Sequence, residues 1–155
     1  MPINDQIECL AAALGPKSAP SSDFDLNPDV VLPAGRKLRP AGVLAAFQVG
    51  PRGLDLILTK RASHLKHHPG QIAFPGGKVD EIDTDIIATA TREAREEVGL
   101  PPENLTIQGC LPVHTTVTGF AVTPVVDWVD CDWRVVIDTG EVAELFEVPL
   151  DFVMK

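Results

Sequence analysis

Residues 74–100 constrain the fold of this chain more than any other stretch. They run Phe-Pro-Gly-Gly, then a short acidic segment, then a helix-forming run that ends at Gly99 before two prolines. Asp83 or Asp85 can cap the start of that helix, because an aspartate side chain accepts a hydrogen bond from a free backbone N–H. The sequence therefore predicts a glycine bend that leads into a helix.

The expected helix separates a buried face from an acidic one. At about 100° per residue, its apolar and small side chains fall on one arc, which predicts the face against the core. These residues are Ile87, Ala90, Thr91, Ala94 and Val98. Glu93, Glu96 and Glu97 share the patch beside this arc, where like charges repel one another. Arg92 lies close enough to Glu96 to orient it.

A solvated, salt-bridged helix face is one interpretation of these carboxylates, since charged runs are common on exposed helices. A metal site is the other, because hard carboxylate oxygens suit Mg²⁺ or Mn²⁺, which also bridge to substrate phosphates. Gly76 and Gly77 favour the metal site, since a glycine bend lets a backbone carbonyl reach a cation. The candidate metal ligands are Glu93, Glu96, Glu97 and the carbonyl of Gly77.

The same stretch resembles the Nudix box of the Nudix hydrolases, GX5EX7REUXEEXGU, in which U is a bulky apolar residue. The matching residues are Arg92, Glu93, Glu96, Glu97, Gly99 and Leu100. The first glycine of the pattern falls on Lys78, one residue after Gly77. Its first glutamate falls on Thr84, beside Asp83, and Ala94 is small for a U position.

A second motif resembles one found in the coenzyme A pyrophosphatase-like branch of the Nudix proteins. That branch is also similar to this chain in having a box longer by one residue and an aspartate at the position of Asp83. That motif, LLTXR(S/A)X3RX3GX3FPGG, precedes the box. The matching residues are Leu58, Thr59, Arg61, Ala62, Gly70, Phe74, Pro75, Gly76 and Gly77. Ile57 replaces the first leucine. Lys66 replaces the second arginine, which keeps the charge but loses the planar fork.

The resemblance implies an α/β fold of the Nudix type, an α/β/α sandwich with a mixed β-sheet between helices. It implies metal-dependent hydrolysis of the diphosphate bond of coenzyme A or its thioesters, giving 3′,5′-ADP and 4′-phosphopantetheine or its acyl derivative. Bound cations would neutralise the phosphates and activate the attacking water. Two alternatives stay open: another substrate such as ADP-ribose or NADH, which Lys66 favours, and a non-catalytic nucleotide-binding module.

Candidate substrate-binding residues precede the box. Arg61 and Lys66 can hold phosphates, Arg61 through bidentate contacts. Phe74 and Gly76 belong to the motif that the resemblance identifies. The neighbouring histidines are interpreted as part of a solvated loop, because no helical face or nearby cysteine completes a metal site. They are His64, His67 and His68.

Further candidates follow the box. Thr118 and Phe120 can line a substrate cleft, with a turn or core packing as the alternative role. Glutamates near the C-terminus act as the base in some Nudix enzymes, so the resemblance makes Glu141 and Glu144 candidates for this role. A plain surface position is the alternative for both.

Composition limits the partners. The 13 basic and 22 acidic residues give a net charge of −9, which argues against nonspecific binding to nucleic acid or to an anionic membrane. A phosphate substrate stays compatible, because bound cations invert the local charge. No apolar run is long enough to span a bilayer and the start is not basic, so we expect a cytoplasmic protein. Cys9, Cys110 and Cys131 lack a CxxC pair and are expected to be reduced thiols.

The 155 residues suffice for one domain with a core of its own. The predicted elements are a helix within 1–14, a flexible linker over 15–35, a hairpin of strands 42–49 and 54–59, and strands 106–111 and 121–129. A closing segment over 141–150 is expected to lead into a last strand. Only five residues follow Leu150, whereas the resembled family continues into another helix. We therefore expect that helix to be absent or replaced by a partner subunit, which leaves a homodimer open.

Overall fold

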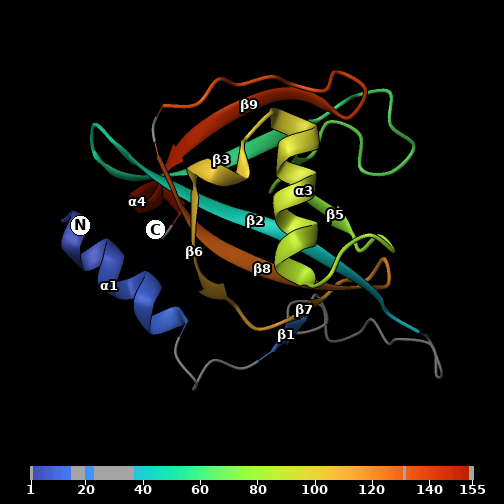
Figure 1. Ribbon diagram of the computed structural model, residues 1–155, viewed down its shortest axis with the longest axis horizontal. Helices are drawn as coiled ribbons and strands as arrows, with labels where there is room; N and C mark the ends of the chain where they lie inside the picture. Colours follow the sequence, from blue (N-terminus) through green and yellow to red (C-terminus); the bar gives the residue numbers. More distant parts are fainter. Residues whose placement is uncertain (1, 15–19, 23–36, 131, 154–155) are drawn as a thin grey trace.

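The computed structural model describes residues 2–14, 20–22, 37–130 and 132–153. In this part of the chain, nine strands form one mixed sheet against which helices pack (Figure 1). The strands are β1 (Ser21–Ser22), β2 (Arg39–Gly50), β3 (Gly53–Arg61), β4 (Ile72–Ala73), β5 (Gly76–Lys78), β6 (Leu105–Cys110), β7 (His114–Thr115), β8 (Phe120–Val129) and β9 (Val142–Pro149). The helices are α1 (Ile3–Ala13), α3 (Ile86–Val98), a 3-10 turn η1 (Pro102–Asn104) and α4 (Leu150–Val153).

Strand β2 is the centre of the sheet. It pairs antiparallel with β3 through the turn at 50–53, which confirms the predicted hairpin. On its other side it runs parallel to β8, so that the sheet is mixed as predicted. Near its start it also pairs with the short strand β5, where Gly42 lies opposite Gly77 and Val43 opposite Gly76. The glycine bend of the box is thereby fixed to the middle of the fold.

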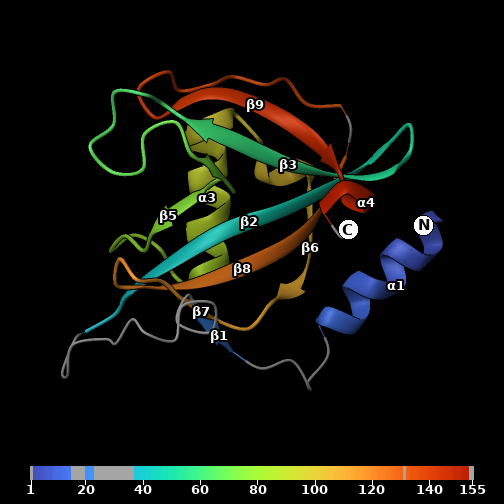
Figure 2. The ribbon, with the colours of Figure 1, turned by 180° about the vertical axis from the view of Figure 1, so that it is seen from behind.

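Alternating side chains of β2 build the two faces of the sheet, because successive residues of a strand point to opposite sides. Leu44 and Ala46 lie in a core cluster with α3, together with Ile57 and Val125. Ala45 lies in a second cluster on the other face, against α1 and α4. Figures 1 and 2 show α3 across one face of the sheet. On the other face, Ile3, Leu10 and Leu14 of α1 pack against the second core cluster. The helices thus lie on both faces, and the predicted α/β/α arrangement is confirmed.

Helix α3 approaches β2 closely because Gly42 has no side chain. A Cβ at Gly42 would lie 2.8 Å from the carbonyl oxygen of Ile86 and 3.3 Å from the backbone nitrogen of Ala90. Ala90 and Ala94 are themselves fully buried. Small residues on both elements therefore set how near the acidic helix lies to the sheet.

Helix α1 is attached by a buried glutamine that the sequence analysis did not single out. Gln6 Oε1 accepts a hydrogen bond of 2.8 Å from the backbone N–H of Leu54 at the start of β3. Gln6 Nε2 donates to Asp151 Oδ1 in α4 at 3.1 Å. One side chain thus joins α1, β3 and α4.

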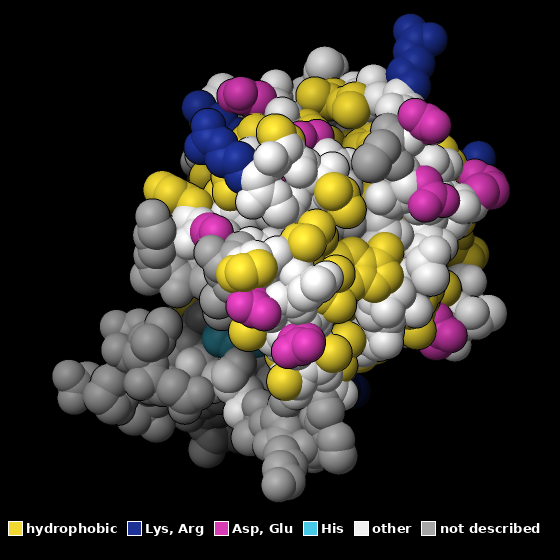
Figure 3. Space-filling model, turned by 90° about the vertical axis from the view of Figure 1, so that its left-hand side faces the viewer, with side chains coloured by type: hydrophobic (Ala, Val, Ile, Leu, Met, Phe, Trp, Pro, Cys, Tyr) yellow, Lys and Arg dark blue, Asp and Glu magenta, His cyan; other side chains and the backbone are white. Residues whose placement is uncertain are grey.

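The side of the molecule that Figure 3 shows has hydrophobic side chains interspersed with acidic ones.

The predicted linker over 15–35 lies mostly outside the described residues. Where it is described, Ser21 and Ser22 form β1, a two-residue strand parallel to β7, and the N–H of Ser21 bonds to the carbonyl of Val113 at 3.1 Å. The closing segment forms β9 and then α4, whose Leu150 packs into the second core cluster.

Cys9 and Cys110 are free and exposed, and Cys131 lies outside the described residues. No helix in the described ranges has both the length and the apolar character that crossing a bilayer requires.

Candidate active site

Helix α3 begins and ends at the residues that its sequence signals mark. Of the two candidate caps, Asp85 takes the position, and its Oδ1 accepts a hydrogen bond of 2.8 Å from the N–H of Ala88. Gly99 ends the helix with a φ of 77°, in the left-handed region that favours glycine. The cap on Asp85 leaves the carboxylate of Asp83 available for another contact.

The buried face of α3 overlaps the predicted arc but does not coincide with it. Ala90, Ala94 and Val98 are fully buried, as predicted. Ile87 and Thr91 are half-buried, and Thr91 Oγ1 donates back to the Ile87 carbonyl at 2.9 Å. Thr89 is fully buried in addition. Its polar side chain is tolerated there because its hydroxyl donates to Asp83 Oδ2 at 2.9 Å.

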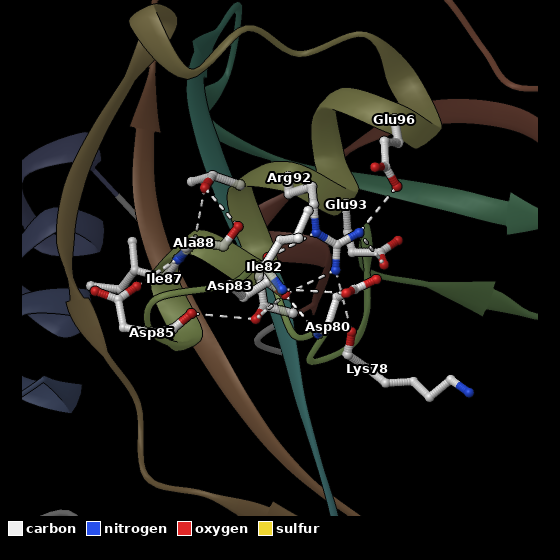
Figure 4. A network of polar contacts seen from close by, with 12 residues as sticks. Lys78, Asp80, Ile82, Asp83, Asp85, Ile87, Ala88, Arg92, Glu93 and Glu96 are labelled. Carbon is white, nitrogen blue, oxygen red and sulfur yellow. Dashed lines mark hydrogen bonds and ion pairs between the residues drawn. The ribbon is translucent and has the colours of Figure 1, made fainter.

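Arg92 lies at the centre of the polar network that Figure 4 shows. Its Nε and Nη2 donate to the two carboxylate oxygens of Asp83, at 2.9 and 3.0 Å. Its Nη1 donates to Glu93 Oε1 at 3.0 Å and to Glu96 Oε2 at 3.2 Å. The expected contact of Arg92 with Glu96 is therefore present. The hydrogen bonds from Arg92 hold the pKa of Asp83 well below its usual range.

Glu93 and Glu97 face the glycine bend. Glu97 Oε2 accepts a hydrogen bond of 3.3 Å from the backbone N–H of Gly76. A Cβ at Gly77 would lie 2.8 Å from the carboxyl carbon of Glu93, so this carboxylate occupies the space beside the bend. Glu96 is more open, with 58% of its side chain exposed. Two of the three carboxylates are thus packed against the bend, and Arg92 holds the third.

The site holds partly buried carboxyl groups whose ionised forms are only partly compensated by neighbouring positive charge. Burial raises the pKa of Glu97 to about 8, and the neighbouring charge of Glu93 contributes to the shift. Burial also raises the pKa of Glu93. The charge of Glu141 acts in the same direction on both carboxylates. A cation at this position would remove the repulsion and favour the ionised forms.

The donors present fit a hard divalent cation. Glu93, Glu97 and the backbone at Gly77 offer oxygen ligands, the type that Mg²⁺ and Mn²⁺ prefer. Within the described ranges, no three His, Cys, Asp or Glu side chains already surround a single point. A Mg²⁺ ion commonly uses only one or two carboxylates and completes its shell with water and substrate phosphate. The arrangement at the bend is compatible with that mode.

The bend lies in the wall of a cavity of about 860 Å³ between α3, the start of β2 and the loop before β9. A cavity of this size is in the range of small-molecule sites. The predicted residues that line it are Arg61, Phe74, Gly76, Gly77, Glu93, Glu96, Glu97, Thr118, Phe120 and Glu141. Arg92 lies behind this wall. Lys66 and Glu144 are exposed and do not line the cavity, so the structure separates these two candidates from the rest.

A family model of the NUDIX domain matches residues 38–151, which is most of the chain. The chain belongs to the Nudix hydrolase family. It is 53% identical over 113 residues to the uncharacterized Nudix hydrolase NudL of Pectobacterium atrosepticum, covering 73% of this chain and 58% of that protein. It is also 53% identical over 100 residues to NudL of Enterobacter sp. (strain 638), covering 64% of this chain and 52% of that protein. The chain thus spans about half the length of the curated relatives it matches.

Solved structures agree with this family. A Nudix hydrolase from M. smegmatis, RenU, superimposes with a TM-score of 0.62 at 26% identity, covering 77% of this chain and 74% of that one. This likeness supports the mixed sheet and its helices as a Nudix fold.

The Nudix box departs from the usual spacing at the residues that form the Asp83–Arg92 pair. The pattern has a glutamate where this chain has Thr84, and the structure brings the adjacent Asp83 to Arg92 instead. The side chain of Asp83 is only 2% exposed. The longer loop therefore still closes against the helix, because an aspartate one position earlier reaches the guanidinium.

Sequence reasoning missed several residues that line the cavity of this Nudix domain. Arg39, Lys78 and Asp138 were not candidates, and His67 and His68 were interpreted as solvated although they border the cavity. The position of the two histidines depends on the loop path, because Arg61 Nη2 donates to the carbonyl of His67 at 3.2 Å. No local sequence pattern marks Arg39 as a cavity residue. It reaches Phe120 because β2 pairs with β8.

Proposed function

We propose that the chain hydrolyses the diphosphate bond of coenzyme A or its thioesters with Mg²⁺ or Mn²⁺, releasing 3′,5′-ADP and 4′-phosphopantetheine or its acyl derivative. The observation that carries the proposal is the packing of Glu93 and Glu97 against the Gly76–Gly77 bend, in the wall of a nucleotide-sized cavity. The motif that contains Arg61 and runs into this bend supports the coenzyme A branch.

The acidic residues around the bend are proposed to bind the cation, and the basic residues to position them or to bind phosphate. Glu93 and Glu97 would hold the cation, with Glu96 and the Gly77 carbonyl assisting. When bound, the cation neutralises phosphate charge and makes a water molecule more acidic. Arg92 is a positioning residue, since it fixes Glu93 and Glu96 from behind. Arg61 lies close enough to lower the pKa of Glu97 by its charge, and it would bind the diphosphate.

Glu141 is the better candidate for the general base. It lines the cavity, and its charge raises the pKa of both Glu93 and Glu97. The backbone holds it in place, because its carbonyl accepts from the N–H of Ala62 at 3.0 Å and its N–H donates to Asp138 at 3.0 Å. Glu144 lies on β9 opposite Lys60, outside the cavity.

The test is release of 3′,5′-ADP from coenzyme A, followed by chromatography with Mg²⁺ or Mn²⁺ present. Glu97→Gln should lower kcat about 100-fold or more, since it removes a ligand of the cation. Glu147→Gln is the matched control, because Glu147 is an exposed glutamate on β9 away from the cavity. A chelator should abolish turnover. No release of 3′,5′-ADP under any metal condition would overturn the proposal.

Another nucleoside diphosphate derivative, such as ADP-ribose or NADH, is the second candidate. The replacement of the second motif arginine by Lys66 favoured this alternative, but Lys66 does not border the cavity. A panel of the three compounds at equal concentration separates the two activities by kcat/KM. A non-catalytic binding module would instead bind one of them in calorimetry and leave it intact.

A further inference from the structure

Arg39 is one of the cationic residues that line the cavity, together with Arg61 and Lys78. Arg39, the first residue of β2, stacks on Phe120, with its Cζ 4.4 Å from the centre of the ring. Both side chains line the cavity. The strands fix this pair, because Arg39 lies opposite Phe120 in the parallel ladder and its N–H bonds to the carbonyl of Gly119 at 2.9 Å.

The guanidinium of Arg39 has unused donors. Across residues 2–14, 20–22, 37–130 and 132–153, no carboxylate or carbonyl accepts a hydrogen bond from it, and the side chain is exposed. By contrast, the guanidinium of Arg92 donates to three carboxylates and to the carbonyl of Lys78. A ring under a guanidinium holds its flat face and leaves its N–H edge directed outward. Such an edge matches two oxygens of a phosphate group.

The loop before β8 holds the backbone of Phe120 in position. Thr116 Oγ1 accepts from the N–H of Phe120 at 3.0 Å, and the N–H of Thr116 donates to the Phe120 carbonyl at 2.9 Å. The hydroxyls of Thr116 and Thr118 are 2.9 Å apart, and both residues border the cavity. Arg39 therefore stacks on the ring of a residue whose backbone is held in place, and two hydroxyl groups that line the same cavity can contact the same ligand.

The spacing along β2 separates this group from the reaction centre. Glu97 contacts the bend at Gly76, which pairs with Val43. Val43 lies four residue steps along β2 from Arg39, which is about 13 Å at the usual rise of a strand. A single diphosphate held by the carboxylate-bound cation and Arg61 does not extend across this interval. Arg39 is instead positioned for a second, separate anionic group of the same ligand.

We infer that Arg39, held on Phe120, binds a phosphate monoester carried by the ribose of the substrate, apart from the diphosphate that is cleaved. This inference rests on the proposed function, because the 3′-phosphate is the group that coenzyme A has and that ADP-ribose and NADH lack. It makes Arg39 and Phe120 the residues that select a 3′-phosphorylated nucleotide.

The experiment compares coenzyme A with 3′-dephospho-coenzyme A for wild type and Arg39→Gln. Loss of a charge-assisted contact should lower kcat/KM for coenzyme A about 10- to 100-fold, mostly through KM. The value for the dephosphorylated substrate should change less than about two-fold, because it has no group for Arg39 to hold. Arg52→Gln is the control, since Arg52 is exposed in the β2–β3 turn and outside the cavity. Equal losses on both substrates would overturn the inference.

Binding of 3′,5′-ADP and 5′-AMP by calorimetry tests the same contact without turnover. Wild type should bind 3′,5′-ADP more tightly, and Arg39→Gln should remove most of that preference. If wild type cleaves neither substrate but keeps this preference through Arg39, the proposed function fails while the inference stands. If coenzyme A is cleaved but Arg39→Gln leaves the preference intact, the inference fails alone.

Discussion

The guanidinium of Arg92 and the carboxylate of Asp83 form a two-pronged pair, with Nε–Oδ1 at 2.9 Å and Nη2–Oδ2 at 3.0 Å. The pair joins the loop before α3 to the acidic face of the helix. Because both oxygens of Asp83 are used, the plane of the guanidinium is fixed and its Nη1 points to Glu93 and Glu96. Asp83 would thereby act on the proposed cation site through Arg92 without touching the cation itself.

The first prediction concerns this pair. Asp83→Asn should leave the fold intact and lower kcat with coenzyme A about 10-fold or more, because partners behind metal ligands commonly contribute that much. An asparagine offers one oxygen to Arg92 where the aspartate offers two. Asp80→Asn is the control, since Asp80 is exposed and has no contact with Arg92. Equal kcat values for Asp83→Asn and wild type would show that Arg92 holds the carboxylates without help.

The second prediction concerns the space beside the bend. In Gly77→Ala, the new methyl group would lie 2.8 Å from the carboxyl carbon of Glu93, and this side chain is flexible enough to move away. The midpoint of thermal unfolding should therefore change little. The concentration of Mg²⁺ needed for half-maximal activity should rise about 10-fold or more, because a displaced ligand weakens the site. In the exposed loop control Gly140→Ala, the metal requirement should stay that of wild type.

Local signals in the sequence predicted the parts of the fold that local interactions determine. The cap at Asp85, the end at Gly99 and the buried alanines of α3 depend on residues within a few turns of one helix. The β2–β3 hairpin likewise depends on a short turn at 50–53. In the same way, the acidic patch and the glycine bend were predicted together, because only a short loop separates them.

Tertiary pairing determined the features that the sequence analysis missed. Arg39 meets Phe120 only because β2 runs parallel to β8, and parallel strands are joined by long connections that leave no local pattern. Gln6 bonds to a backbone group 48 residues away. Lys66 and Glu144 had the right chemistry, but the loop path and the strand register place them outside the cavity.

The third prediction concerns Asp127, a fully buried carboxylate on β8 whose two oxygens have no hydrogen-bond partner in the described part of the chain. Burial raises its pKa from 3.8 to about 7. Because the folded state holds this proton more tightly than the unfolded state, its contribution to stability is complete below pH 4 and is lost as the pH rises through 7. The loss is about 4 kcal/mol at most, at 1.36 kcal/mol per pKa unit.

Urea unfolding at pH 5 and pH 8 measures this effect. Asp127→Asn should have a free energy of unfolding close to that of wild type at pH 5 and a higher one at pH 8, because the amide cannot ionise. Glu97 has a raised pKa as well, but it is present in both proteins, so the difference between them reports Asp127. Asp130→Asn, at an exposed position three residues on, should follow wild type at both pH values. A variant less stable than wild type at pH 8 would show that the buried carboxylate is stabilised by a partner.

The fourth prediction concerns the attachment of α1. Gln6→Ala would leave the backbone N–H of Leu54 buried without its acceptor, which should lower the free energy of unfolding by about 1–3 kcal/mol. Gln108→Ala is the control, because that glutamine is exposed and bonds only to the nearby Thr106 carbonyl. Hydrogen exchange at the Leu54 amide gives the specific readout, since this amide should lose protection before the rest of β3. If it stayed protected while overall stability fell, α1 would be held to the sheet by its apolar side chains alone, and Gln6 would only fill space.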